Sequence, residues 1–194
     1  MSLLEQVKFL LRITKTNDII RRYFVVNGFD GALTMMGLII GFIVSTPADL
    51  SVIINACLGA AIALGMSGLS SAYISESAER QHALGILEEA MISDLHESAH
   101  GEASRWVPIL VALVNGLAPL VISLLILMPL WLSKAGVQLP VPPLYAAISI
   151  ALFLIFLLGL FIGHIAKISW LRGGIQTLLV AVLTAGMIFL FAGH

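Results

Sequence analysis

The sequence predicts an all-α integral membrane protein with five transmembrane helices and a cytoplasmic helical connection between the second and third helices. Composition is the first observation behind this prediction, since 59% of the 194 residues are hydrophobic and only 11% are charged. Soluble domains carry about 25% charged residues. The second observation is that long runs of the chain hold no charge at all. Runs of this length favour helices, because membrane β-strands are short and alternate in polarity.

Five apolar segments each have about the 20 residues that a helix needs to cross the hydrocarbon core. They run approximately over Tyr23–Thr46, Leu50–Ile74, Trp106–Leu132, Leu144–Ile165 and Leu171–Ala192. The chain therefore divides into a cytoplasmic amphipathic N-terminal helix (1–22), two spans (23–74), a cytoplasmic acidic helical connection (75–105) and three further spans (106–194). We expect no cleavable signal peptide, because charges interrupt the first stretch.

The distribution of Lys and Arg predicts the orientation in the membrane. Nine of the ten lie before the first span, in the second connection or around the fourth connection, and only Lys134 lies on the other side. Since positive charge stays in the cytoplasm, we expect a cytoplasmic N-terminus and a C-terminus outside or in a lumen. The expected location is a prokaryotic cell membrane or a vacuolar-type membrane.

The first fifteen residues have the pattern of a helix that lies on the membrane surface. Apolar residues share one helical face and basic residues lie off it: Leu3, Leu4, Val7, Leu10 and Leu11 on the face, and Lys8, Arg12 and Lys15 off it. Such a helix binds an anionic inner leaflet. We interpret it as an anchor with the lipid bilayer as its partner.

Asp30 is an acid within the first span, toward its cytoplasmic end. A carboxylate at the centre of a membrane helix costs roughly 2.5–3.5 kcal/mol on insertion scales, and such residues usually serve ions or protons. Asp30 is thus a candidate for binding a cation when ionised and a proton otherwise. The alternative is a structural acid paired with Arg21, Arg22 or a helix end. Met35 adds a thioether that favours softer ions, although methionine in a helix is commonly plain packing.

The connection 75–105 carries seven acids and only two arginines, together with three histidines. No proline interrupts it, so we expect helix. Glu76 and Glu79 are three residues apart and His96 and His100 are four apart, so each pair shares a helical face. Carboxylates and imidazoles suit Fe²⁺, Mn²⁺ or Zn²⁺. The candidate metal ligands are Asp30, Glu76, Glu79, Glu88, Glu89, His96, Glu97 and His100.

Two other interpretations of this connection remain open. The string from His96 through Glu97 to His100 matches the His-Glu-x-x-His pattern of zinc proteases, which also needs a third ligand and a substrate cleft. A solvated charged helix that binds no metal is the other alternative.

Several stretches, taken in order, resemble the vacuolar iron transporter family. Residues 27–33, Asn-Gly-Phe-Asp-Gly-Ala-Leu, resemble the Gly-x-x-Asp-Gly-Leu signature that opens its first span. Residues 65–75, which end in Ala-Tyr-Ile-Ser, resemble its second span, and residues 116–120, Gly-Leu-Ala-Pro-Leu, resemble its third. Residues 172–193, with Arg-Gly-Gly at 172–174, Ala-Gly at 185–186 and Gly193, resemble its glycine-bearing last span. The chain departs from the family where the usual Glu is Ala72 and the usual Met is Gly68.

The resemblance implies a homodimeric exporter of Fe²⁺ or Mn²⁺ from the cytosol, exchanged for protons, without a permanently bound cofactor and with no enzymatic activity. Candidate residues of the transport pathway are Asp30, Asn27, Met35, Met66 and Asn115. Met66 and Glu76 lie near the two departing positions and are candidates to substitute for them. No nucleic-acid partner is expected.

Small residues spaced four apart, at Gly37 and Gly41 and again at Gly159 and Gly163, allow close helix approach. In the first span this suits either a dimer axis or packing within one subunit. Two other function classes stay open: a membrane-bound zinc-dependent hydrolase that uses His96, Glu97 and His100, and a membrane structural protein that transports nothing.

Overall fold

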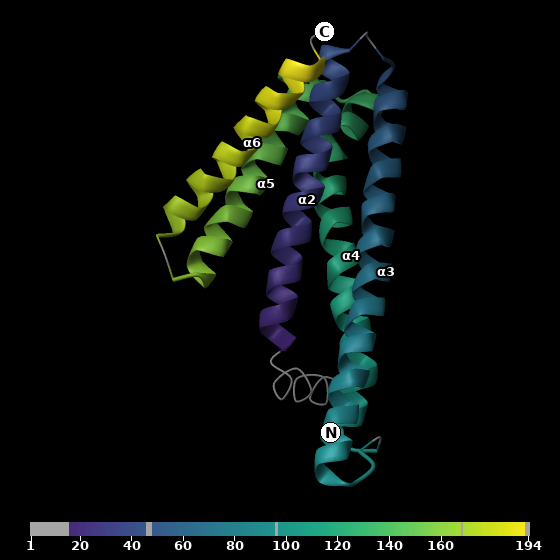
Figure 1. Ribbon diagram of the computed structural model, residues 1–194. Helices are drawn as coiled ribbons and strands as arrows, with labels where there is room; N and C mark the ends of the chain where they lie inside the picture. The colour runs from purple at the N-terminus through teal and green to yellow at the C-terminus, as the bar shows by residue number, and fades with distance from the viewer. Residues whose placement is uncertain (1–15, 46–47, 96, 168, 193–194) are drawn as a thin grey trace. The chain divides into compact units, whose positions relative to one another are not determined.

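The computed structural model describes residues 16–45, 48–95, 97–167 and 169–192, and five α-helices make up most of them. The helices are α2 (Thr16–Val44), α3 (Leu50–Met91), α4 (Ala99–Lys134), α5 (Pro143–Ile165) and α6 (Trp170–Ala192) (Figure 1). All five are long and apolar enough to cross a membrane. The prediction of an all-α chain with five helices long and apolar enough to span a membrane is confirmed, and it supports an integral multi-pass membrane protein. The amphipathic pattern of residues 1–15 lies outside the described residues.

The acidic connection differs from the single helix that its sequence predicts. It consists of the end of α3, a turn, and the start of α4, because the two spanning helices continue to 42 and 36 residues. The turn begins at Ile92, whose φ of 49° ends α3. The Ser98 hydroxyl accepts the amide hydrogens of His100 and Gly101 at 3.2 and 3.4 Å and so caps the start of α4. Ser98 was a helix-start signal that an uninterrupted-helix prediction overlooks.

The described chain folds as two compact units. Unit 1 comprises Met1–Phe24 and Gly65–Leu117, and unit 2 comprises Val25–Leu64 and Ala118–His194. The core of unit 1 is built from small and β-branched residues of α3 and α4, against which the first turns of α2 pack. Its buried members are Ala72, Ala103, Val107, Val111 and Ala112, and its partly buried members are Ile19, Ile20, Tyr23 and Leu69. Small residues at these positions let the helices approach closely.

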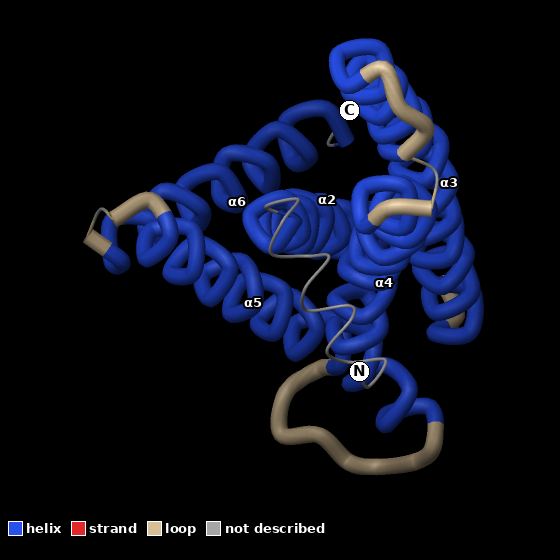
Figure 2. Tube along the Cα trace, turned by 90° about the horizontal axis from the view of Figure 1, so that it is seen from below, coloured by secondary structure: helices blue, strands red, loops and turns tan. Residues whose placement is uncertain are grey.

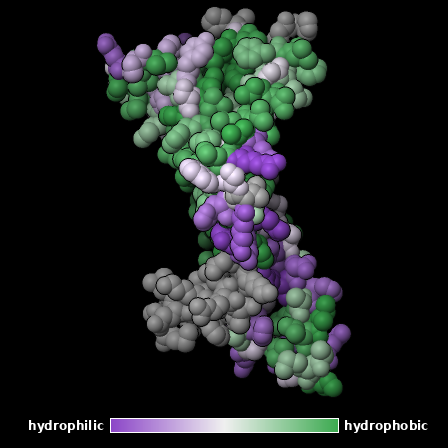
Figure 3. All heavy atoms as spheres, turned by 90° about the vertical axis from the view of Figure 1, so that its left-hand side faces the viewer, coloured by the Kyte–Doolittle hydropathy of each residue, from purple (hydrophilic) through white to green (hydrophobic). Residues whose placement is uncertain are grey.

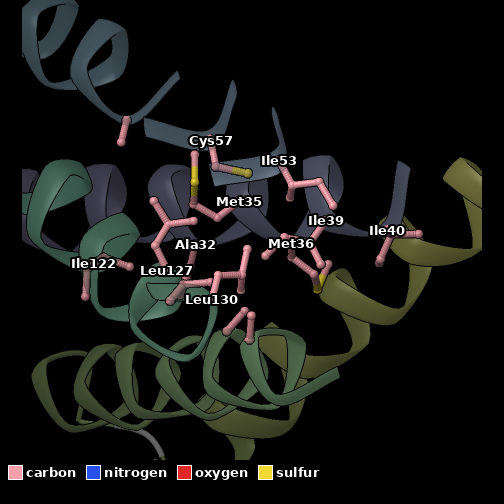
Figure 4. Packing of buried hydrophobic residues seen from close by; sticks show 14 of the residues in the cluster. Ala32, Met35, Met36, Ile39, Ile40, Ile53, Cys57, Ile122, Leu127 and Leu130 are labelled. Atoms are coloured by element: carbon pink, nitrogen blue, oxygen red, sulfur yellow. The ribbon is translucent and has the colours of Figure 1, made fainter. Parts of the chain in front are cut away.

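The larger core lies in unit 2, where α2, α3 and α4 contribute one continuous apolar cluster (Figure 4). Met35, Met36 and Cys57 are fully or almost fully buried in it, and Leu127 and Leu130 pack from α4. Met35 thus fills core space among aliphatic side chains. Of the two interpretations of Met35, an ion ligand or a packing residue, the structure therefore favours the packing residue.

Helices α5 and α6 run antiparallel in unit 2, and they meet at the turn that joins them (Figure 2). A Cβ atom at Gly159 would lie 2.7 Å from the carbonyl oxygen of Gly173, and one at Gly163 would lie 2.9 Å from Cα of Trp170. The Thr177 hydroxyl also donates to the Ile155 carbonyl at 3.1 Å. The Gly159–Gly163 spacing therefore serves packing within one chain.

The outer face of α6 exposes large apolar side chains along its length, including Ile175, Leu179, Leu183, Leu190 and Phe191. Figure 3 shows hydrophobic residues gathered over the upper part of that view. Such a surface is typical of helices whose outer face contacts lipid rather than water.

Candidate functional site

Asp30 lies on α2 between two buried glycines and is itself exposed. A Cβ atom at Gly31 would lie 2.8 Å from Cα of Pro119 on α4, and one at Gly28 would lie 3.5 Å from the Leu158 side chain on α5. These glycines let the α2 backbone approach its neighbours in unit 2. The close approach fixes the helix rotation, and with it the position of the Asp30 carboxylate.

The Asp30 carboxylate has no hydrogen-bond or ion-pair partner within the described part of the chain. Arg21 instead donates to Asp18, one turn earlier on α2. Arg22 lies over the ring of Tyr23, 5.7 Å from its centroid. Neither arginine therefore neutralises Asp30 here, and the carboxylate is available to a ligand.

Asp30 lies next to a close contact between α2 and α4. A Cβ atom at Gly31 would meet Pro119, which is the middle residue of the predicted span Trp106–Leu132. Together with that predicted span, the contact favours a position of Asp30 away from the membrane surface, where an acid is costly.

The other pathway candidates divide between the two units. In unit 2, Asn27 and Asp30 are three residues apart on α2 and share a helical face, whereas Met35 is buried in the core. In unit 1, Met66 is 59% exposed on α3, and Asn115 is buried on α4. Asn27 and Asp30 are thus the pair that the fold brings together.

Asn115 joins α4 to α3 inside unit 1. Its side-chain amide donates to the carbonyl oxygen of Gly68 at 2.6 Å. A Cβ atom at Gly68 would lie 2.8 Å from the carbonyl oxygen of Asn115, and one at Gly116 would meet the backbone of Gly65 at 2.6 Å. At Gly68 the helices thus leave no room for the methionine that the resembled family has there. The departure at Gly68 thus has a packing role, which the small-residue spacing of Gly65, Gly68 and Ala72 signals in the sequence.

We expect Asn115→Ala to lower the free energy of unfolding by about 1 kcal/mol, because hydrogen bonds between membrane helices average about 0.6 and reach about 1.7 kcal/mol. The measurement is denaturant-induced unfolding in micelles, followed by circular dichroism. Asn55→Ala is the matched control, since Asn55 is exposed on the same helix that Asn115 contacts. Equal stability of the two variants would contradict the role assigned to this hydrogen bond.

The described candidate ligands of the acidic connection form no cluster. Among the described residues, no group of three or more His, Cys, Asp or Glu side chains is placed to hold a metal ion. Glu76 pairs with Arg80 at 3.5 Å, and Glu88 accepts the amide hydrogen of Leu95 at 2.9 Å. A metal ion at either residue would compete with these contacts. The Glu76–Arg80 pair has the i, i+4 spacing and was readable from the sequence.

The remaining candidates of the connection lie at its surface. Glu79, Glu89, Glu97 and His100 are exposed. His96 lies outside the described residues, so the predicted His96–His100 pair stays a prediction. The exposed carboxylates give this part of unit 1 a surface that attracts cations.

Comparison with known proteins gives one informative relative. The uncharacterized protein MJ0645 of Methanocaldococcus jannaschii is 31% identical to this chain over 172 residues, which cover 87% of this chain and 86% of the archaeal protein. No family model matches the chain. No solved structure matches it.

Proposed function

We propose that this chain, which belongs to the same protein family as MJ0645 of Methanocaldococcus jannaschii, is a membrane transporter that exports Fe²⁺ or Mn²⁺ from the cytosol in exchange for protons. The observation that supports this most is Asp30, an exposed carboxylate without a partner among the described residues, on a helix apolar enough to span a membrane. A membrane protein keeps such a group where it serves an ion or a proton path.

The chemistry of exchange follows from the two states of one carboxylate. Ionised Asp30 offers two oxygen ligands and a negative charge to a divalent cation, whereas protonated Asp30 has lost the charge and keeps only a weak neutral acceptor. Binding of a proton therefore releases the cation, and binding of the cation displaces the proton. Asn27, one turn before Asp30, carries an amide oxygen of the type that can serve as a further ligand of the ion.

A second copy of the chain is part of this proposal. Asp30 is exposed on a helix whose neighbouring positions are apolar, and lipid would not solvate its charge. A homodimer around this face of α2 covers the carboxylate and brings two acids to one ion, which suits a divalent charge. This dimer does not use the face of α2 at Gly37. A Cβ atom at Gly37 would already lie 3.4 Å from the Ile188 side chain on α6 of the same chain.

The acidic connection supports the proposal as a cation collector. The predicted orientation places it in the cytosol, and its exposed carboxylates raise the local concentration of divalent ions there. A connection that carries imidazole as well as carboxylates favours Fe²⁺, Mn²⁺ or Zn²⁺ over Mg²⁺ and Ca²⁺.

The test is a metal-resolved flux measurement in proteoliposomes. We expect vesicles that are acidic inside to accumulate Mn²⁺, or Fe²⁺ under anaerobic conditions, while protons leave. Zn²⁺, Ca²⁺ and Mg²⁺ measured in the same way define the selectivity. Uptake should fall to the protein-free rate when an ionophore collapses the pH gradient. A protein that moves none of these ions faster than empty vesicles would refute the proposed function.

A further inference from the structure

A groove of about 570 Å³ lies between α3 and α4 in unit 1. Side chains with hydrogen-bond donors line it: Tyr73, Ser77 and Gln81 from α3, and Arg105 from α4, beside Ser104, whose hydroxyl donates to the Gly101 carbonyl at 2.8 Å. Two antiparallel helices thus contribute hydroxyl, amide and guanidinium groups to one concave surface. The transport proposal makes no use of this groove.

The groove begins where the two helices leave the predicted membrane spans. Tyr73 and Ile109 belong to the ends of the spans 50–74 and 106–132, whereas Ser77 and Arg105 lie just beyond them. Tyr73 is 47% exposed, and Trp106, next to Arg105, is 58% exposed. Exposed Tyr and Trp at span ends mark the level of lipid headgroups. One end of the groove therefore meets acyl chains and the rest meets headgroups or water.

Arg105 gives the groove a positive charge that no contact in the described part of the chain neutralises. The other arginine of the connection, Arg80, is paired with Glu76. Guanidinium binds phosphate through parallel hydrogen bonds, and hydroxyl and amide donors nearby can satisfy the remaining oxygens. The chemistry of this end of the groove thus matches one phosphate group.

Glu88 lies at the end of the groove toward the turn and accepts the amide hydrogen of Leu95. Its carboxylate disfavours ligands with several negative charges, such as nucleotides or inorganic polyphosphate. Gly85 keeps the groove open, because a Cβ atom there would meet nothing within 4 Å. A ligand with a single phosphate diester and an apolar tail fits all of these conditions.

We propose that this groove binds a phospholipid, with its phosphate at Arg105 and the Ser77 and Gln81 donors, and with an acyl chain beside Tyr73 and Ile109. Basic pockets at helix ends on the cytoplasmic side are a known setting for lipid headgroups. The bound lipid links α3 to α4 at the membrane surface. This proposal stands independently of metal transport.

The test measures binding of phosphatidylglycerol to the delipidated full-length protein by native mass spectrometry. We expect Arg105→Gln to bind it about tenfold more weakly, because a charge-assisted hydrogen bond is lost. Arg172→Gln is the matched control, since Arg172 is an exposed arginine at the start of α6, outside the groove. An equal effect of the two substitutions would show unspecific attraction of anionic lipid and would overturn the proposal.

A second variant fills the groove without changing its charge. We expect Gly85→Leu to weaken lipid binding at least as much as Arg105→Gln, and Gly59→Leu, also in open space on α3, to leave it unchanged.

Binding of glycerol phosphate, measured in the same way, distinguishes a lipid headgroup from a soluble phosphate ester as the source of the phosphate. If it binds alone with the same dependence on Arg105, the site belongs to a soluble phosphate ester and the lipid assignment fails. Unchanged lipid binding in Gly85→Leu would also overturn it.

Discussion

Replacing Asp30 by alanine is expected to reduce metal uptake, driven by a pH gradient, by about 100-fold, to the rate of protein-free vesicles. The substitution removes the one acidic oxygen donor on this stretch of α2, and with it both the cation ligand and the proton carrier. Since Asp30 has no partner among the described residues, its loss should leave the folded state intact. The measurement is initial Mn²⁺ uptake into proteoliposomes with an acidic interior.

Three companion variants sharpen this test. Asp30→Asn keeps the size of the side chain and should be as inactive as Asp30→Ala, because charge and titration are what the exchange needs. Asp30→Glu should retain part of the activity. Asp18→Ala is the matched control, as an exposed acid on the same helix that pairs with Arg21 near the helix start. Undiminished uptake by Asp30→Ala would remove Asp30 from the transport path.

Substituting valine for Gly173 is expected to separate α5 from α6 and to destabilise the folded protein by about 3 kcal/mol, the upper range for overpacking. A Cβ atom at Gly173 would overlap the carbonyl oxygen of Gly159 and would lie 3.0 Å from the amide nitrogen of Gly163. These obstacles are backbone atoms, which cannot rotate away. The pair would have to move apart and lose the hydrogen bond from Thr177 to Ile155.

The measurement is thermal unfolding of the purified protein in detergent, together with the fraction that elutes as a single species. Gly186→Val is the matched control, because it lies on the same helix and a Cβ atom there would meet nothing within 4 Å. Both variants add the same side chain to α6. Equal melting temperatures of Gly173→Val and Gly186→Val would contradict the close backbone contact between α5 and α6 at Gly173.

The number and approximate positions of the spanning helices were predictable because they depend on local sequence. An apolar run of about 20 residues favours a membrane helix wherever it occurs in the chain. The ends of α3 and α4 were less predictable, because helix formers continue past Ile74 and precede Trp106 without a change of secondary structure. The break between them depends on one turn, at Ile92, and one cap, at Ser98.

The candidate site was predictable as a residue but not as an environment. Asp30 is conspicuous as an acid within an apolar segment, and its spacing from Asn27 can be counted. Its lack of a partner among the described residues and the close packing of its neighbour Gly31 on Pro119 could not be counted, because they depend on how the helices fold. The same holds for Met35. The sequence around it is compatible both with a side chain in an ion path and with one in the core, and only the fold shows that Met35 is buried in the core.

By itself the sequence determined that this is a multi-pass membrane protein with an acid in its first span, since hydropathy and charge belong to segments and need no partner. The tertiary structure alone decided what the small residues and the polar side chains do. Asn115 meets Gly68, 47 residues away, and Gly173 meets Gly159. The groove at Arg105 likewise exists only between two helices. Contacts of this kind depend on helix rotation and close approach, which are set by packing between segments distant in sequence.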